Sequence, residues 1–462
     1  MREEISYTGL WWLPEKPDEQ ISGTLTFNPE SGSILSLIGR FGDMFSSMEM
    51  LQPDVINGFT TNGKKITLLK CYEANRSGSL PGMQTSILHA NLLFIGANYV
   101  KKEDIKFNMV CAKLNNLDEW VGISGLEIKY NYDNHSTSIN YKLPDPIHFE
   151  INDDYIAKFN FTAKNPSISI FNKKAAIEQS AQLIIETKEQ KLYDYNDFLN
   201  IVFTFQMFLT LATFEASYPL EIEFYSPDVY FEFDGKKIPE PITLHYSSSI
   251  KSKNKDLIPW DMLFMYQDIS TNFQTIIKIW YNSQNKLNSI LGLFLNTFYN
   301  PRVFNENTFL NLAQALESYH RRFYKNNVLD KTDHKLRIDE IVDAVDDKHK
   351  EWLKTKLSFS NEPSLYERLT ELLAEHTNTT INKMVNVPEV FLKSIRDSRN
   401  YYTHFDKSTE SKASKGQDLY YLTEKMKVLL TCCLLHATGF DKTLIQKLLS
   451  RNEFRNFNHL IK

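Results

Sequence analysis

The spacing of apolar residues changes near residue 250 of this 462-residue chain, and the change limits the folds that are open to it. Before residue 250, short alternating apolar runs are separated by turn-forming residues, which is typical of β-strands. After it, apolar residues recur three and four positions apart, which is typical of amphipathic helices. We therefore expect an α+β protein, in which a β-rich N-terminal domain of sandwich or barrel type precedes an all-α helical bundle.

The clearest turn signal in the first part is Asn62-Gly63, because both residues tolerate the positive φ of a two-residue hairpin turn. A helical segment is expected further on, at about 174–214. Strands are predicted at residues 24–27, 34–39, 59–61, 65–69, 92–96, 107–112, 126–132, 138–141, 147–151, 220–225 and 242–246.

The second part carries helical spacing almost throughout. Helices are predicted at residues 268–298, 306–325, 338–357, 364–376, 390–402, 418–436 and 442–449, with a less regular segment at 378–386. A polar, serine- and lysine-rich stretch at 247–255 is the expected linker. The predicted organisation is thus a β-rich sensing or regulatory region at 1–250, a helical connector at 251–300 and a helical domain at 301–462.

Composition excludes several classes of protein. A hydrophobic fraction of 42% and an aromatic fraction of 13% are typical of packed cores and not of disordered chains. The four cysteines are too few for a disulfide framework, and we expect buried thiols with no metal or cofactor. The apolar run at 198–214 is interrupted by polar residues and falls short of the roughly 20 residues of a membrane span. We expect a buried helix there, in a soluble cytoplasmic protein that does not contact the membrane.

Charge is distributed unevenly along the chain. Residues 301–462 hold 26 Lys and Arg against 22 Asp and Glu, a balance of +4. Since the net charge of the whole chain is −5, residues 1–300 carry a net charge of −9. A basic C-terminal third favours a polyanionic partner such as RNA at that end of the molecule.

The residues that carry chemistry stand at the end of the helix predicted at 390–402, in the sequence RNYYTH at 399–404. On a helix, Asn400 and His404 share one face, and Arg396 lies one turn before them. Arg399 lies about 140° around the helix axis from His404. We therefore expect Arg399 to approach His404 only if the helix frays or turns at its end.

These residue types suit metal-independent cleavage of RNA, in which the 2′-OH attacks the adjacent phosphate. Histidine moves protons near neutral pH, so His404 is expected to act as the general base or acid. Arginine offers a permanent charge and a two-pronged set of donors, so Arg399 is expected to stabilise the charge on the phosphate. The amide of Asn400 is expected to position these groups. Arg396, Thr403 and Glu317 are expected to support the site.

The same residues also fit a plain alternative. Arginine followed by histidine after four to six residues arises by chance about once in a chain of this size, and the strict form, with asparagine, aspartate or histidine directly after the arginine and three more residues before the histidine, in on the order of one chain in ten. Arg396 and Arg399 would then pair with Asp397 or Asp406 at a solvated helix end. Glu317 and His320, on the helix predicted at 306–325, belong either to the same cleft or to an ordinary exposed face, and the pattern leaves both open.

A resemblance to a known family bears on this choice. The stretch at 399–404 resembles the R-N-x-x-x-H signature of HEPN ribonucleases, and LAQALESYHRR at 312–322 resembles the first HEPN helix of the ApeA-like group. Three segments near the N-terminus, at 9–14, 22–27 and 35–39, are similar to the ApeA N-terminal domain. Trp120, within LDEW at 117–120, fits the same pattern.

The resemblance implies a bacterial anti-phage defence protein that acts by abortive infection through a HEPN endoribonuclease. It also implies a homodimer, in which two sets of Arg399, Asn400 and His404 form one composite site. The products would carry a 2′,3′-cyclic phosphate and a 5′-OH, and transfer RNA is the candidate substrate. The phage signal that triggers cleavage is not evident from the sequence. The alternative is a non-catalytic HEPN dimer that binds RNA, nucleotide or a protein partner, and a separate activity of residues 1–250 ranks below both.

Overall fold

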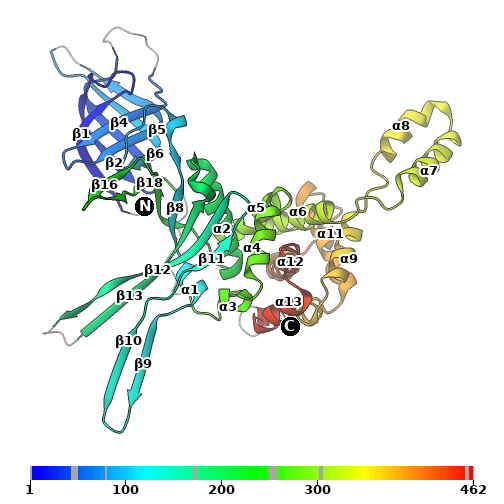
Figure 1. The fold of residues 1–462 in the computed structure, drawn as a ribbon. Helices are drawn as coiled ribbons and strands as arrows, with labels where there is room; N and C mark the ends of the chain where they lie inside the picture. The colour runs from blue at the N-terminus through cyan, green and yellow to red at the C-terminus, as the bar shows by residue number, and fades with distance from the viewer. Residues whose placement is uncertain are drawn as a thin grey trace. The chain divides into compact units, whose positions relative to one another are not determined.

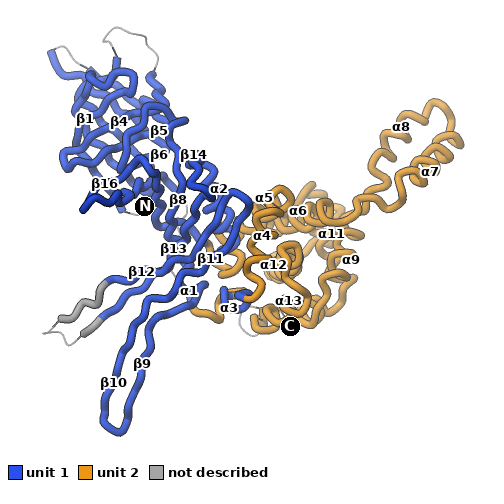
Figure 2. Tube along the Cα trace, viewed as in Figure 1, with its two compact units in different colours: residues 1–209, 217–257, 265–270 blue, residues 210–216, 258–264, 271–462 orange. Residues whose placement is uncertain are grey.

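The computed structural model describes residues 3–42, 50–78, 81–169, 174–248, 257–300, 305–452 and 457–460. The chain forms two compact units (Figure 2), here called unit 1 and unit 2. Unit 1 comprises Met1–Leu209, Ser217–Leu257 and Met265–Ser270, and unit 2 comprises Thr210–Ala216, Ile258–Phe264 and Thr271–Lys462. Most of the linker expected at 247–255 lies outside the described residues, and the domain boundaries expected at 250 and 300 stay predictions.

Unit 1 contains a twelve-stranded antiparallel sheet, part of which closes on itself as a six-stranded barrel (Figure 1). The barrel closes because β5 pairs with both β4 and β6, so that the order β6-β3-β2-β1-β4-β5 returns to its start. Closure removes the unpaired edges that an open sheet would expose. The barrel strands are β1 (Ile5–Trp12), β2 (Ile21–Asn28), β3 (Gly32–Ile38), β4 (Val55–Thr60), β5 (Lys65–Ser77) and β6 (Thr85–Ile95). The predicted β-rich, barrel-like N-terminal domain is thereby confirmed.

Trp11 is the largest side chain inside the barrel. It is fully buried, and its indole N–H donates a hydrogen bond to the carbonyl of Gly23 at 3.1 Å. Gly58 on the neighbouring strand makes room for the ring, because a Cβ atom there would lie 2.4 Å from Trp11 Cε3. The remaining core is aliphatic and aromatic, and includes Leu25, Phe27, Leu35, Leu37, Ile56, Ile66, Leu68, Leu88 and Leu93.

The sheet continues beyond the barrel through β18 (Ile242–Tyr246), β15 (Pro219–Tyr225), β8 (Met109–Leu114), β13 (Lys174–Thr187), β12 (Tyr155–Ser169) and β11 (Ile147–Glu150). Helix α2 (Tyr195–Thr213) packs on this part of the sheet, where Phe205 contacts Phe159 at a ring-centroid distance of 5.6 Å. The apolar run at 198–214 is therefore the buried helix that the sequence predicts. In the described part of the chain, no helix combines the length and apolar character that crossing a membrane requires.

The helix predicted from residue 174 is wrong over its first half, where the chain forms strand β13. Ala181, Leu183 and Ile185 are buried at alternate positions while the residues between them are not, and β13 pairs with β12 on one side and β8 on the other. Alanine, glutamate and glutamine in this segment favour helix in isolation. Pairing with two neighbouring strands outweighs that local preference. Strands β1 and β12 are also present, although the sequence did not indicate them.

Unit 1 also contains two short helices, α1 (Leu117–Val121) and α3 (Tyr266–Ile269). Two short strand pairs join β7 (Lys106–Phe107) to β14 (Tyr193–Asp194) and β16 (Tyr230–Phe233) to β17 (Lys236–Pro239). A longer hairpin is formed by β9 (Leu126–Asn131) and β10 (Ser136–Tyr141), which pair only with each other among the described strands. One of its faces is apolar yet exposed to solvent, with Ile128 opposite Ile139 and exposed fractions of 49% and 55%.

Unit 2 is helical, as predicted, and α6 lies at its centre in contact with α5, α9, α11 and α12. The expected helix at 338–357 is two helices, α7 and α8, and the expected helix at 268–298 is likewise divided between α3, α4 and α5. The helices of unit 2 are α4 (Phe273–Asn282), α5 (Gln284–Tyr299), α6 (Asn305–Phe323), α7 (Lys331–Asp343), α8 (Asp347–Leu357), α9 (Leu365–Glu375), α10 (Thr379–Val385), α11 (Pro388–His404), α12 (Gly416–Ala437) and α13 (Lys442–Asn452).

Helices α7 and α8 form an arm that extends away from the other helices of unit 2 (Figure 1), called the α7–α8 arm below. Val342 is its one buried residue among those described. The base of the arm is closed by Asn361, whose side chain accepts from the amide of Leu329 at 2.8 Å and donates to its carbonyl at 3.0 Å. The amide of Val328 also donates to the Asn361 carbonyl at 2.8 Å.

Substitution Gly58→Ala tests the packing of Trp11. The added methyl group would overlap a rigid, fully buried ring, and overpacking of a filled core costs about 1–3 kcal/mol. We expect the urea midpoint of the barrel to fall accordingly. Gly292→Ala is the matched control, because this exposed helical glycine has open space around its Cβ position and alanine there gains about 0.5–1 kcal/mol. Equal midpoints for Gly58→Ala and the parent protein would contradict the described packing.

Candidate active site on helix α11

Helix α11 begins where proline favours it and ends at the last residue of the motif. Pro388 occupies the first turn, where its missing N–H costs no hydrogen bond. Phe405 ends the helix in the left-handed region with φ of 51°, and its amide donates to the carbonyl of Tyr401 at 2.6 Å. The sequence also predicts that the apolar residues Val390, Phe391 and Ile395 anchor the face of α11 opposite the motif. Phe391 and Ile395 are indeed buried inside unit 2, whereas Val390 is 61% exposed and does not anchor the helix. Its position at the start of the helix lies beyond the packed face.

The three motif residues lie together at the exposed end of α11. Asn400 and His404 are one turn apart and both are exposed, which leaves the amide and the imidazole free to meet a ligand. Arg399 is partly covered, with a side-chain exposure of 37%. The helix α11 stays regular up to His404 and the chain turns only at Phe405, so α11 does not fray between Arg399 and His404. No hydrogen bond or ion pair within the described residues joins Arg399 to Asn400 or His404.

Arg399 faces helix α6 and the carboxylate of Glu317. Its Nη2 atom lies 3.9 Å from Glu317 Oε2. The other oxygen of Glu317 accepts from Arg321, at 3.2 Å from Nη2 and 3.3 Å from Nε. Glu317 therefore lies between two guanidinium groups, one from its own helix and one from the motif.

His320 does not join this exposed cluster. It is fully buried, with Nε2 at 2.7 Å from Glu371 Oε2 and Nδ1 at 3.0 Å from Arg368 Nη1. Arginine can only donate, so Nδ1 must be the acceptor and the ring must carry its proton on Nε2. Burial lowers the pKa of His320, which favours the same neutral form. These contacts give His320 a structural role inside the helical unit.

Arg396 and Thr403, which were also expected to support the site, form hydrogen bonds with neighbouring residues of α11. The Arg396 guanidinium pairs with Asp397, at 2.8 Å from Nε to Oδ1, and lies over the ring of Tyr366. For Arg396 the pairing with Asp397 foreseen in the solvated-end alternative is therefore present. Thr403 donates its hydroxyl to the carbonyl of Arg399 at 2.7 Å, so this side chain is turned to its own helix.

A buried hydroxyl and a tyrosine hold the segment that follows α11. Ser398 is fully buried, and its Oγ accepts from the amide of Ser414 at 2.9 Å. Tyr402 donates its hydroxyl to the carbonyl of the same residue at 2.9 Å. Sequence reasoning missed both residues. Their only signal is a polar atom on the buried face of an amphipathic helix, and that does not identify the partner.

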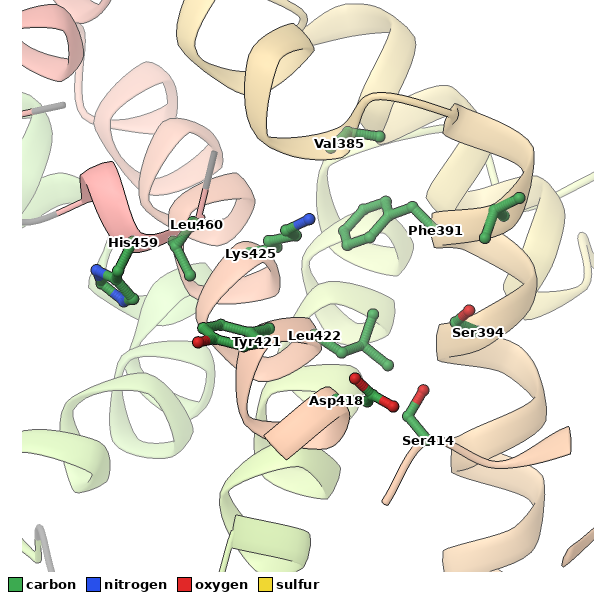
Figure 3. A pocket seen from close by; sticks show the side chains of 11 residues that line it. Val385, Phe391, Ser394, Ser414, Asp418, Tyr421, Leu422, Lys425, His459 and Leu460 are labelled. Carbon is green, nitrogen blue, oxygen red and sulfur yellow. The ribbon is translucent and has the colours of Figure 1, made fainter. Parts of the chain in front are cut away.

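A cavity of about 410 Å³ lies between α11 and α12, on a different face of α11 (Figure 3). Phe391 and Tyr421 lie on opposite sides of it, and Asp418 and Lys425 are two helical turns apart along α12. Burial lowers the pKa of Lys425. None of the three motif residues lines this cavity, so the motif and the cavity are separate features of unit 2.

Metal ligands are not gathered at the motif. Within the ranges that the structure describes, no group of three or more His, Cys, Asp or Glu side chains is placed to hold a metal ion. The four cysteines are buried free thiols, as predicted: Cys71, Cys111, Cys432 and Cys433.

Substitution Ser398→Ala tests the tie between α11 and the segment that follows it. Loss of one buried hydrogen bond of about 0.5–1.5 kcal/mol should raise amide exchange at Ser414 roughly two- to tenfold. Hydrogen–deuterium exchange on peptides that span residues 405–415 measures this. The exposed Ser411 of the same segment supplies the control Ser411→Ala. Unchanged protection in Ser398→Ala would show that this hydrogen bond does not hold the segment.

Two family models match the chain, one over most of unit 1 and the other over most of the helices of unit 2. ApeA N-terminal domain 1 matches residues 6–280, which is more than half of the chain, and Apea-like HEPN matches residues 310–444. The second match includes all of α11 and the part of α6 that carries Glu317. No curated protein and no solved structure matches the chain.

Proposed function

Because the chain belongs to the ApeA-like family of defence proteins, we propose that it is a metal-independent endoribonuclease that protects bacteria against phage by abortive infection. The observation that carries the proposal is the cluster at the end of α11. His404 and Asn400 are exposed on one face, and Arg399 stands beside them with its guanidinium directed at Glu317.

The proposed reaction uses only these side chains and the RNA. His404, acting as base, takes the proton of a ribose 2′-OH, whose oxygen then attacks the adjacent phosphorus. The bond from phosphorus to the 5′-oxygen breaks, and that oxygen leaves with a proton supplied by the second imidazole of a dimer. Arg399 stabilises the negative charge that builds on the phosphate oxygens, and Asn400 holds the phosphate or the imidazole in place. The products are a 2′,3′-cyclic phosphate and a 5′-OH.

A homodimer supplies what one chain lacks. Within one chain, Arg399 turns toward α6, and no hydrogen bond or ion pair among the described residues joins it to His404, which lies about 140° around the helix axis. Two copies of α11 meeting around a twofold axis would place the arginine of one chain near the histidine of the other. The exposure of Asn400 and His404 leaves this end of α11 open for such a contact.

The proposed substrate is a single-stranded RNA loop, with transfer RNA as the first candidate. Loops offer splayed bases and the in-line geometry that attack by the 2′-OH requires. The barrel of unit 1 would then serve as the sensing or regulatory part that responds to a phage signal. A HEPN dimer that binds RNA, nucleotide or a protein without cleaving is the alternative that the next experiment separates.

Substitution His404→Ala should reduce cleavage of a transfer RNA pool at least about a hundredfold, because positioned proton transfer contributes 10²–10⁴ in rate. The exposed His349 of α8 gives the control His349→Ala, which should cut like the parent. Gel analysis with 5′-end mapping measures the rate and the 5′-OH ends. If the parent and His404→Ala bind RNA equally and neither cleaves it, the non-catalytic alternative replaces this proposal.

Removal of divalent ions is the second test of the mechanism. The proposed site uses an imidazole and guanidinium groups in place of a metal, so the rate in excess EDTA should stay within about twofold of the rate in Mg²⁺ at matched ionic strength. Matching the ionic strength matters because RNA binding weakens with salt. Cleavage that stops in EDTA and returns with Mg²⁺ would contradict the mechanism.

A further inference from the structure

The carboxylate of Glu362 lies outside helices α6 and α11, yet a series of ion pairs connects it to the motif. Glu362 lies in the segment between α8 and α9, and its Oε2 accepts from Arg321 Nη1 at 2.7 Å. Arg321 in turn binds Glu317, the partner of Arg399. The alternating order Glu362, Arg321, Glu317, Arg399 leads from this segment to the candidate site.

Glu362, the member of this ion-pair series farthest from the motif, is held by the buried guanidinium of Arg368. Arg368 is fully buried, and its Nη2 lies 3.5 Å from the same Oε2 of Glu362. Its Nη1 donates to Nδ1 of His320 at 3.0 Å, and His320 donates to Glu371. A buried charge is costly unless it is paired, and Glu362 is the one carboxylate within ion-pair distance of Arg368 among the described residues. Glu362 therefore has little freedom to leave its place.

All three guanidinium nitrogens of Arg321 bind carboxylates. Nη1 meets Glu362, while Nη2 and Nε meet Oε1 of Glu317. Two carboxylates on one guanidinium fix its plane as well as its position. With Oε1 of Glu317 engaged in this way, Oε2 remains for Arg399 at 3.9 Å.

We propose that Glu362 is a positioning residue of the candidate site: by holding Arg321 it fixes Glu317, and through Glu317 it sets the place of the Arg399 guanidinium. The inference rests on the proposed function. Without Glu362, Arg321 loses its shortest ion pair and is free to turn, and the Glu317 carboxylate turns with it. A displacement of about 1 Å in a group that stabilises the transition state can cost up to about a hundredfold in rate.

The same residue links the site to the α7–α8 arm. Asn361, its neighbour in the chain, closes the base of the arm through hydrogen bonds to Val328 and Leu329. A shift of that base therefore moves the backbone of Glu362 and, through the ion pairs, the motif arginine.

Substitution Glu362→Gln keeps the shape of the side chain and removes its charge. We expect kcat for RNA cleavage to fall about tenfold or more with KM changed less than about twofold, because Glu362 acts on Arg399 and not on the bound RNA. Glu375→Gln is the matched control: Glu375 lies in α9 and pairs with Lys442 at 2.7 Å, outside the chain of ion pairs. Its kcat should stay within about twofold of the parent.

A double-mutant cycle separates positioning from general support of the fold. If Glu362 acts through Glu317, then Glu317→Gln and the double variant Glu317→Gln/Glu362→Gln should have the same kcat. If the two losses multiply, Glu362 acts independently and the proposal is overturned. Thermal unfolding of each variant, in the full chain, checks that a lower rate does not come from unfolded protein.

Failure of this inference is distinguishable from failure of the proposed function. Activity in the parent and its loss in His404→Ala, together with normal kcat in Glu362→Gln, would overturn the positioning role alone. If the parent does not cleave RNA, crystal structures of the parent and of Glu362→Gln decide the matter. Displacement of Arg321 and Arg399 in the variant would support the inference, and side chains that stay in place would overturn it.

Discussion

A guanidinium cannot be buried without partners that offset its lost hydration, and this constraint organises the helical unit. Arg368 is fully buried, and His320 and Glu362 approach its two terminal nitrogens. The need to satisfy that charge fixes Glu362, and the fixed carboxylate reaches Arg321 at the surface. A feature of the core thus determines how side chains stand at the exposed end of the bundle. The motif is short, but its geometry depends on α6, α9 and α11 together.

The two units use different physical devices. The barrel in unit 1 removes its strand edges by closing, and its centre is a tryptophan fitted against two glycine-bearing strands. Unit 2 surrounds one central helix, α6, which contacts α5, α9, α11 and α12. Its buried residues are mostly apolar, while Arg322 binds α5 and Glu317 faces α11. Apolar side chains are buried in both units, whereas the proposed site in unit 2 is bordered by the ion pairs of Glu317 with Arg321 and Arg399.

Periodicity predicted the classes of structure well, because it reports which side of a segment is buried. It located the barrel region, nearly all the C-terminal helices and the buried helix α2. It failed for β13, where helix-favouring residues lie in a strand that is held by two neighbours, and at 344–346, where one apolar pattern is divided between α7 and α8. The motif at 399–404 was visible from residue types and spacing. Glu362 was not, since a single glutamate 37 residues before Arg399 has no sequence pattern that ties it to an arginine on another helix.

The hairpin of β9 and β10 shows a different kind of constraint. Its polar face carries Glu127 and Lys129, which pair with each other at 3.0 Å, while the opposite face presents Ile128 and Ile139 to water. Among the described strands, β9 and β10 pair only with each other, so no further strand pairs with their outer edges there. An exposed apolar face on a strand pair with open edges, as in this hairpin, is the combination that promotes strand-to-strand association between copies. Exchanging its two isoleucines for threonine would disturb no interior packing.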